Sequence, residues 1–342
     1  MRALVYEEFN GPLAVREVPD PSPSDGGVVV RVGASGLCRS DWHGWRGHDP
    51  DIALPHVPGH ELAGEVIAVG RGVRQWRACQ RVTVPFICAC GRCAQCAAGD
   101  HQVCPNQTQP GFTHWGSLAE LVALDAADVN LVALPDDMSY AAAASLGCRF
   151  ATAYRAVVPQ GRVRAGEWVA VHGCGGLGLS AVHIAVAAGA RVVAVDIASG
   201  ALELAARLGA EHLIDASDER EVADRIIELT SGGAHLSLDA LGHAGVCFAS
   251  VSCLRPRGRH VQVGLLPEGG GAVPMSRVIA LELEVLGSHG MAAHAYPQML
   301  GLVIAGRLRP QDLVTAELTL DQAGAALRCL GATPGISVVT SF

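Results

Sequence analysis

The stretch Trp168-Val-Ala-Val-His-Gly-Cys-Gly-Gly-Leu-Gly178 decides the fold of this 342-residue chain. An apolar strand, Trp168–Val171, leads into a G-x-G-x-x-G pattern, and the sequence predicts a helix from Leu177 to Ala188. Glycines at such a junction let the backbone approach a pyrophosphate that lies on the helix N-terminus. The alternative is an ordinary glycine-rich turn. The context favours a dinucleotide site formed by Gly173, Gly175, Gly176, Leu177 and Gly178.

An acidic residue follows the glycines at the sequence separation that is typical of a dinucleotide site. Asp196 ends the next predicted strand, Arg191–Val195, eighteen positions after Gly178. A carboxylate there accepts hydrogen bonds from the adenosine ribose and repels a 2′-phosphate. Because no Arg follows Asp196 closely, the sequence favours NAD over NADP.

The surrounding region alternates short Val/Ile/Leu runs with Ala-rich helical stretches. Continuous apolar strands between helices indicate a parallel sheet that is covered on both faces. The pattern extends over residues 152–290 and includes the predicted strands Leu236–Ala240 and His260–Val263. We therefore predict an α/β, doubly wound cofactor domain for this region.

Both flanking regions look different. Residues from Leu4 to about Val84 are rich in Val, Gly and Pro, and their short strand-like runs predict an irregular, mostly antiparallel β domain. We also predict a strand over Gly116–Val122 and a helix over Tyr140–Leu146. Residues 291–342 carry two helical patterns and a terminal strand, which we expect to return to the first domain.

Composition excludes several classes of function. Half of the residues are hydrophobic and 17% are charged, and the formal net charge is -8. No Lys/Arg run exists to follow a phosphate backbone, so we do not expect nucleic-acid binding. No apolar stretch reaches the roughly 20 residues that span a bilayer, and Met1-Arg2-Ala3-Leu4 lacks a signal-peptide pattern. We expect a cytoplasmic protein without membrane contact.

Twelve cysteines in such a compartment indicate metal binding or catalysis more than disulfides. Four of them form a compact group within a lobe at about residues 88–105: Cys90, Cys93, Cys96 and Cys104. Two residues separate each of the first three, which is typical of a closed, four-thiolate structural zinc site. The alternatives are a disulfide pair or an iron–sulfur cluster. Cys88 lies outside the pattern.

A second group of possible ligands is scattered. Cys38-Arg39-Ser40-Asp41-Trp42-His43 places a thiol, a cation, a hydroxyl, a carboxylate and an imidazole within six residues. His60 and Cys148 follow much later. Together with Cys38 they would give a Cys₂His set with one position open, as in catalytic zinc sites. Taken alone, each could equally be a buried core residue.

In their order along the chain, these motifs resemble those of the zinc-dependent medium-chain alcohol dehydrogenases. The resemblance covers the whole chain. It implies that residues 1–151 and 291–342 form a GroES-like catalytic domain, that residues 152–290 form a Rossmann domain, and that the active site lies between them.

The resemblance also implies roles for the metal-binding residues. Cys38, His60 and Cys148 match the catalytic zinc ligands, and the four cysteines of the lobe match a structural zinc site. Glu61 matches a carboxylate beside the metal that eases exchange of the fourth ligand. Asp41 matches the partner that orients the histidine ligand. Two Zn²⁺ ions per chain are therefore expected.

Cofactor and substrate positions follow in the same way. Arg39 resembles a pyrophosphate contact, Thr152 a residue near the nicotinamide, and Val263 and Gly264 the strand end beside the carboxamide. Many relatives carry an Arg near the C-terminus where this chain has Gly335-Ile336. The candidate walls of the substrate pocket, each of which could instead be a core aromatic, are Trp45, Phe86 and Trp115.

The resemblance implies reversible hydride transfer between NAD and an alcohol, which we expect to be primary and medium-chain or aromatic. Zinc lowers the pKa of the bound alcohol oxygen. Ser40 takes the proton and passes it along the cofactor ribose to His43, whose imidazole titrates near neutral pH; the alternatives are a turn serine and a surface histidine.

We expect the partners to be a small alcohol or aldehyde and further copies of the chain, as a homodimer or homotetramer. Val285-Leu286 could be a sheet edge for this assembly, or an interior strand. Two other functions stay open: a polyol or sugar dehydrogenase of the same superfamily, and a non-catalytic sensor that binds zinc and nucleotide.

Overall fold

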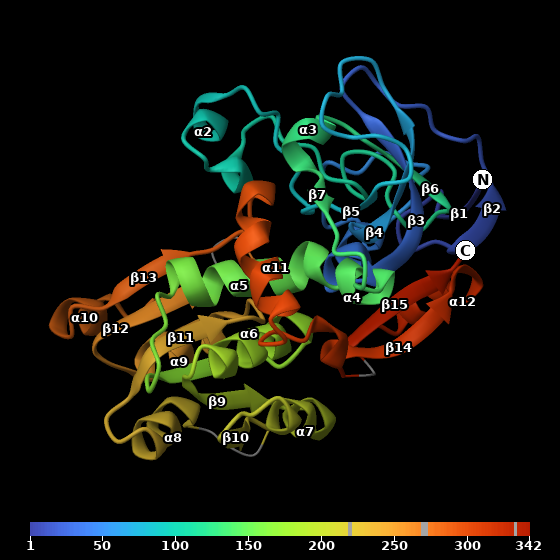
Figure 1. Cartoon of the computed structure of the whole chain (residues 1–342). Coiled ribbons are helices and arrows are strands. Elements are labelled where there is room, and N and C mark those ends of the chain that lie inside the picture. The colour runs from blue at the N-terminus through green and yellow to red at the C-terminus, as the bar shows by residue number, and fades with distance from the viewer. Residues whose placement is uncertain (218–220, 268–272, 332–333) are drawn as a thin grey trace. The chain divides into compact units, whose positions relative to one another are not determined.

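The computed structural model describes residues 1–217, 221–267, 273–331 and 334–342, and these fall into two compact units (Figure 1). The first unit contains Met1–Ala151, the segment that starts at Gly290, and the C-terminal Ile336–Phe342. The second unit contains Thr152–His289. Among the described residues, no helix has the length and apolar character needed to cross a membrane.

The second unit is built on a six-stranded, wholly parallel sheet, as predicted. Its strand order is β10-β9-β8-β11-β12-β13. The strands are β8 (Trp168–His172), β9 (Arg191–Asp196), β10 (His212–Asp215), β11 (Ala234–Asp239), β12 (Leu254–Gln262) and β13 (Glu284–Gly287). The order reverses beside β8, which is the position where doubly wound sheets bind nucleotides. The mixed α/β fold class predicted from the sequence is confirmed.

Helices connect and cover these strands. In the second unit they are α5 (Ala151–Arg155, which starts at the last residue of the first unit), α6 (Gly176–Ala187), α7 (Ser199–Arg207), α8 (Val222–Leu229), α9 (Ala244–Ser252) and α10 (Met275–Ala280). A π-helical turn, Ala156–Gln160, follows α5. Helices α6 and α7 pack against β9, and α9 packs against β11 and β12. Strand β13 is the last in the sheet order, and Val285 on it is 42% exposed, so Val285-Leu286 lies at an edge.

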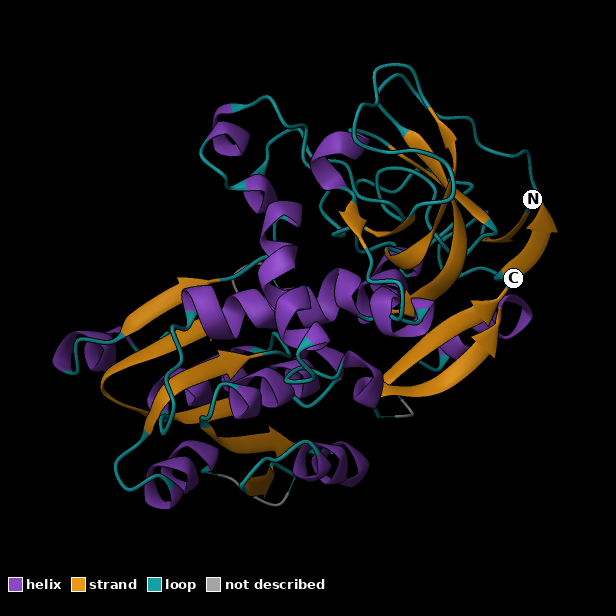
Figure 2. Cartoon of the chain, viewed as in Figure 1, coloured by secondary structure: helices purple, strands orange, loops and turns teal. Residues whose placement is uncertain are grey.

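The first unit is mostly strands and long loops (Figure 2). Its main sheet has the order β14-β15-β3-β4-β5-β7, and β6 pairs with β3 beyond this path. A separate pair is formed by β1 and β2. The strands are β1 (Arg2–Val5), β2 (Ala14–Glu17), β3 (Val28–Leu37), β4 (Glu61–Val69), β5 (Arg81–Thr83), β6 (Leu121–Leu124), β7 (Val132–Ala133), β14 (Val314–Thr319) and β15 (Ile336–Ser341).

Strand β3 organises this sheet because it pairs with β15, β4 and β6. Its pairs are all antiparallel, whereas β14 and β15 run parallel. The register places Gly36 opposite Glu61, which brings the end of β3 beside the start of β4. Alternating Val and Leu side chains of both strands form a buried core, which includes Val30, Leu62 and Val66.

The helices of the first unit are short. They are α1 (Arg39–Trp45), α2 (Ala94–Ala97), α3 (Ala127–Asn130), α4 (Tyr140–Ala144), α11 (Tyr296–Ile304) and α12 (Leu320–Arg328). Short 3₁₀ turns occur at η1 (His101–Val103), η4 (Ala293–Ala295) and η5 (Pro310–Leu313), and η2 (Leu146–Phe150) is a π-helical turn.

Strands β11 and β12 start earlier than the predicted Leu236–Ala240 and His260–Val263, and two predicted elements of the first unit differ more strongly. The strand expected over Gly116–Val122 is present only as β6, because the backbone of residues 116–118 bonds instead to the loop at 57–59. The helix expected over Tyr140–Leu146 ends at Ala144, and η2 follows. Such π-helical turns occur frequently at functional sites, and this one carries Cys148.

Candidate active site

Four side chains that could bind a metal ion converge in the first unit. The donor atoms of Cys38, His60, Glu61 and Cys148 all lie within 4.8 Å of one another. Cys38 is the N-cap of α1, His60 immediately precedes β4, and Cys148 lies in η2. The fold thus brings together three donors that the sequence spreads between positions 38 and 148.

Asp41 holds this group in place. Its Oδ1 lies 2.9 Å from His60 Nδ1 and accepts a bond from the Gly59 backbone N–H at 3.0 Å. Its Oδ2 accepts a bond from the Cys38 backbone N–H at 2.9 Å. Asp41 and His60 are buried, and His60 Nε2 has no hydrogen-bond partner among the described residues. A buried nitrogen that faces two thiols and lacks a partner fits a metal ligand.

The thiols of Cys38 and Cys148 differ in their pKa values. The pKa of Cys38 lies well below its ordinary value, first because of the hydrogen bond with Cys148 and further because of the Arg149 charge. The same hydrogen bond, together with burial, raises the pKa of Cys148. Cys38 is therefore the readier thiolate, which is the form that binds metals.

Glu61 is paired with Arg149, a residue that the sequence analysis did not identify. Arg149 donates from Nε to Oε1 and Oε2 of Glu61 at 2.9 and 3.1 Å, and Nη2 also bonds Oε2. Its backbone N–H donates to Oε1 at 3.0 Å. Only the position of Arg149, directly after Cys148, could have drawn attention to it.

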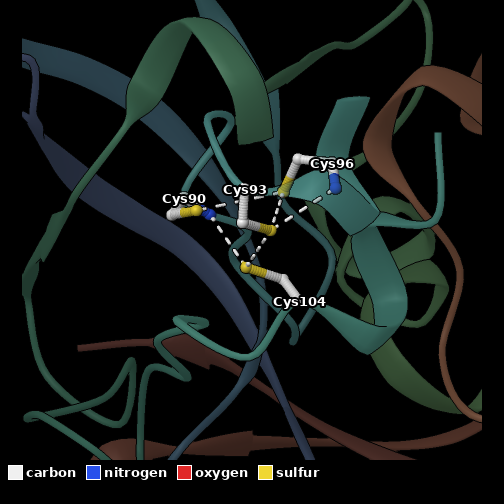
Figure 3. A group of neighbouring side chains, drawn as sticks. All are labelled: Cys90, Cys93, Cys96 and Cys104. Carbon is white, nitrogen blue, oxygen red and sulfur yellow. Dashed lines mark hydrogen bonds between the residues drawn. The ribbon is translucent and has the colours of Figure 1, made fainter. Parts of the chain in front are cut away.

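The four cysteines of the lobe form a second group (Figure 3). Cys93 Sγ lies 3.4 Å from Cys96 Sγ and 3.7 Å from Cys104 Sγ, and Cys90 Sγ lies 4.0 Å from Cys96 Sγ. These distances exceed the sulfur–sulfur bond length of a disulfide, about 2.05 Å. Zinc–sulfur bonds of about 2.3 Å would place tetrahedral sulfurs about 3.8 Å apart. The group therefore fits a four-thiolate zinc site, and Cys88 lies outside it.

The lobe has a narrow base. Cys88 and Thr108 exchange two backbone hydrogen bonds of 2.8 Å, so the chain enters and leaves the lobe at one pair of residues. Asn130 binds the backbone of Ala89 through both ends of its amide, at 2.7 and 3.0 Å. Few apolar side chains back the four sulfurs; Ala89 and Val129 are among them.

Helix α1 carries further polar side chains beyond the group formed by Cys38, His60, Glu61 and Cys148, which we call the mixed cluster. Ser40 Oγ lies 3.8 Å from Cys38 Sγ. One turn further, His43 Nδ1 lies 2.9 Å from Nδ1 of His48, and both rings pack edge-on against Trp42. His43 is exposed at the surface, yet the partial burial of its ring lowers its pKa, and the charges of His48 and Arg39 lower it further. His48 was not identified from the sequence because it lies in a loop with no recognisable spacing.

The predicted pocket residues lie in different surroundings. Phe86 packs edge-on against the His60 ring at a centroid distance of 6.1 Å. Phe112, which the sequence analysis missed, lies closer at 5.1 Å. Trp45 packs with Phe112 in one apolar cluster and donates to the Gly11 carbonyl. Trp115 donates to the Pro55 carbonyl and packs on another cluster.

In the second unit, the glycine-rich turn and Asp196 lie together. Asp196 accepts bonds from the backbone N–H groups of Cys174 at 2.5 Å and Ala198 at 2.9 Å. Helix α6 begins at Gly176, next to Leu177. A Cβ on Gly178 would lie 1.7 Å from the Gly173 carbonyl oxygen, so no side chain fits there.

The remaining predicted cofactor contacts are distributed over both units. In the second unit, Val263 and Gly264 follow β12, and both donate to the Asp239 carbonyl. Thr152 has a buried hydroxyl without a partner among the described residues. In the first unit, the Arg39 guanidinium lies over the Trp42 ring at 5.3 Å.

Comparisons with known proteins agree with this arrangement. Residues 24–136 match the alcohol dehydrogenase GroES-like domain, and residues 176–305 match the zinc-binding dehydrogenase domain. An alcohol dehydrogenase from Geobacillus stearothermophilus is 37% identical over 290 residues, which is 84% of each chain.

Solved structures are similar over their full length. The alcohol dehydrogenase TADH from Thermus sp. ATN1 superposes with a TM-score of 0.92 at 32% identity, and all of both chains is covered. A structure described as an NAD-dependent alcohol dehydrogenase gives 0.90 at 31% identity, again covering all of both chains. The chain therefore belongs to the zinc-type medium-chain alcohol dehydrogenase family.

Proposed function

We propose that this protein is a zinc- and NAD-dependent alcohol dehydrogenase that interconverts an alcohol with its aldehyde or ketone. The observation that carries the proposal is the Cys38–His60–Cys148 group, in which His60 Nε2 has no hydrogen-bond partner within the described part of the chain and Asp41 binds the other ring nitrogen. Three donors of this kind leave one position open for substrate.

Each residue of the site has a part in the reaction. Cys38, His60 and Cys148 hold the ion, and Asp41 fixes the tautomer and orientation of His60. When bound there, zinc supplies Lewis-acid polarisation of the substrate oxygen. The four cysteines of the lobe hold the second zinc ion, which has a structural role.

The proton leaves through the chain's own groups. Ser40 Oγ, which lies 3.8 Å from Cys38 Sγ, takes the proton of the substrate hydroxyl as it gives up its own proton toward His43. His43 holds the proton at the outer end of the path and shares it with His48, which is exposed to solvent. The lowered pKa of His43 keeps its imidazole neutral, and so able to accept a proton, at pH 7.

The second unit binds NAD in this proposal. The turn at Gly173–Gly178 takes the pyrophosphate at the N-terminus of α6, and Asp196 takes the adenosine ribose. The Asp196 carboxylate disfavours NADP. Arg39 contacts the pyrophosphate, Thr152 lies near the nicotinamide, and Val263 and Gly264 bind the carboxamide. The relative described as NAD-dependent supports this choice.

The substrate is a primary alcohol with a medium-chain or aromatic group. Support comes from the aromatic rings beside His60, which are those of Phe86 and Phe112, with Trp45 packed behind the second. We further propose a homodimer or homotetramer, in which the exposed edge of β13 is one contact surface.

The test is reduction of NAD, with NADP in parallel, over primary, secondary and polyhydroxy alcohols. We expect turnover of primary alcohols with NAD. Preference for polyols would move the protein to the polyol dehydrogenases. No turnover with any alcohol, in protein shown to hold both zinc ions, would contradict the proposal and favour a non-catalytic sensor.

A further inference from the structure

The ion pair between Glu61 and Arg149 borders the proposed metal site on two sides but takes no proton and touches no substrate in the proposed reaction. Glu61 directly follows His60, and Arg149 directly follows Cys148. Each partner is therefore the chain neighbour of a proposed zinc ligand. Both side chains are buried, with exposed fractions of 0% for Glu61 and 10% for Arg149.

Arg149 occupies both oxygens of the carboxylate. Oε1 accepts the backbone N–H and Nε of Arg149, and Oε2 accepts Nε and Nη2. The fork of a guanidinium matches a carboxylate in this way, whereas an ammonium does not. The carboxylate is nevertheless one of the four groups whose donor atoms lie within 4.8 Å of one another. It is close enough to compete for the ion.

The surrounding backbone leaves the pair little room. A Cβ on Gly36 would lie 2.3 Å from Glu61 Oε2 and 3.2 Å from Arg149 Nη2. A Cβ on Gly147 would lie 3.1 Å from the Glu61 Cα, and the Gly147 carbonyl is held by the Tyr296 hydroxyl at 3.2 Å. The absence of a side chain at Gly36 and Gly147 thus leaves room for the ion pair, and a larger residue at either position would press on it.

The position of the Glu61 carboxylate depends on which cation it pairs with. A buried carboxylate without a cation is strongly disfavoured. In this pocket the carboxylate has two possible cations, the Arg149 guanidinium and the zinc ion. If the guanidinium is removed, the Glu61 carboxylate must either take up a proton or be compensated by the metal ion beside it.

We propose that Arg149 is a positioning residue that holds the Glu61 carboxylate off the zinc ion, and so keeps the fourth coordination position open. This inference rests on the proposed function, because it requires zinc on Cys38, His60 and Cys148. Arg149 touches no reacting atom. It acts through Glu61, which becomes a zinc ligand when the guanidinium is absent.

The experiment uses the full chain with cobalt(II) in place of the catalytic zinc, and imidazole as the probe. Imidazole must take the fourth position, and its binding is read from the visible spectrum of the cobalt ion. We expect Arg149→Met to weaken imidazole binding by roughly tenfold or more, in the range that partners of metal ligands produce. The double variant Glu61→Gln/Arg149→Met should bind imidazole within about threefold of the wild type.

The double variant is the matched control, because it lacks the same guanidinium but also the competing carboxylate. Wild-type affinity in Arg149→Met, with only a lower melting temperature, would overturn the proposal and leave Arg149 a structural partner. Equal weakening in the single and double variants would also overturn it. Where Arg149→Met does not fold, Arg149→Gln is measured in its place, with the same expectation.

Failure of this inference can be told apart from failure of the proposed function. A wild-type protein that oxidises alcohols, beside variants with unchanged imidazole affinity, refutes only the role of Arg149. A wild-type protein that binds no cobalt at Cys38 and Cys148, seen as missing thiolate-to-cobalt absorption, refutes the metal site itself.

Discussion

The two cysteine-containing clusters of the first unit differ in how they are assembled. The four-thiol lobe takes all its donors from residues 90–104, whereas the mixed cluster takes them from positions 38 to 148. The lobe offers four like ligands, and the mixed cluster offers two sulfurs, a nitrogen and a carboxylate that Arg149 already binds. A closed site can be built by one loop. An open site needs a whole domain to hold three ligands while the fourth position stays free.

The support behind each cluster differs as well. Few apolar residues back the lobe, so metal binding must supply most of its ordering free energy. The mixed cluster rests on the core between β3 and β4 and on the three bonds of Asp41. We therefore expect loss of a ligand to cost stability in the lobe and activity in the mixed cluster.

The largest effect is expected from Cys104→Ala. Structural zinc sites contribute about 10 kcal/mol or more of apparent binding free energy, so losing one thiolate should unfold the lobe. Zinc content should fall from two ions to one per chain, with a clearly lower melting temperature. Cys88→Ala is the control, since burial raises the pKa of Cys88 to about 12 and the thiol lies outside the cluster. An unchanged zinc content in Cys104→Ala would show that the lobe does not depend on its fourth thiolate to bind zinc.

Next in size is Cys148→Ala, which should also lose one zinc ion but keep its melting temperature closer to the wild type. Lewis-acid catalysis contributes several kcal/mol, and about 4 kcal/mol corresponds to a roughly thousandfold fall in kcat/KM. Steady-state kinetics and metal analysis of the same preparation check this. A loss of stability as large as in Cys104→Ala would make both clusters structural.

A smaller effect is expected from Asp41→Asn. The amide keeps the size of the side chain but can no longer accept from all three partners. Partners of metal ligands change activity or metal affinity by about 10–100-fold. The zinc dissociation rate, measured with a coloured chelator, should rise for one of the two ions only. Faster release of both ions would show that Asp41 stabilises the whole domain.

The smallest effect concerns the pH dependence of alcohol oxidation. Because the pKa of His43 is lowered, first by burial and then by the charges of His48 and Arg39, its neutral form persists below pH 6.5. The acid limb of kcat/KM should therefore lie below pH 6.5. His48→Gln removes one positive neighbour and should move this limb to higher pH. His43→Gln should remove the limb, with a rate loss below the roughly hundredfold that a positioned base supplies, because water can carry the proton.

An acid limb that stays unchanged in both variants would contradict a role for this pair in the proton path. Arg46→Gln is a useful control, because Arg46 stacks on Trp42 like Arg39 but does not contribute to the pKa of His43.

Local patterns allowed much of the molecule to be predicted. The spacing of Cys90, Cys93, Cys96 and Cys104 identifies the lobe because one short loop brings the four thiols together. The parallel sheet follows from apolar strands that alternate with helices. Asp41 and His60 were paired through the family resemblance, and the structure places them 2.9 Å apart.

What could not be predicted depends on contacts between distant segments. Arg149 and Glu61 are 88 positions apart in sequence, and they meet only because β4 and η2 pack together. Phe112 reaches His60 from a loop without periodicity. The strand expected at Gly116 is absent because its backbone groups bond to residues 57–59, a choice that no local propensity encodes.

The register that places Gly36 opposite Glu61 also has a consequence for the order of folding. Contacts between distant segments form later than local ones, because closing a long loop costs more entropy. All four donors of the lobe are present once residue 104 has been synthesised, and the contacts that close its base, from Thr108 and Asn130, follow soon after. The mixed cluster must wait for residue 148 and for the pairing of β3 with β4. We expect the two metals to enter in sequence, the structural ion first, and a refolding reaction that is supplied with a single equivalent of zinc to fill the lobe while the catalytic position stays apo.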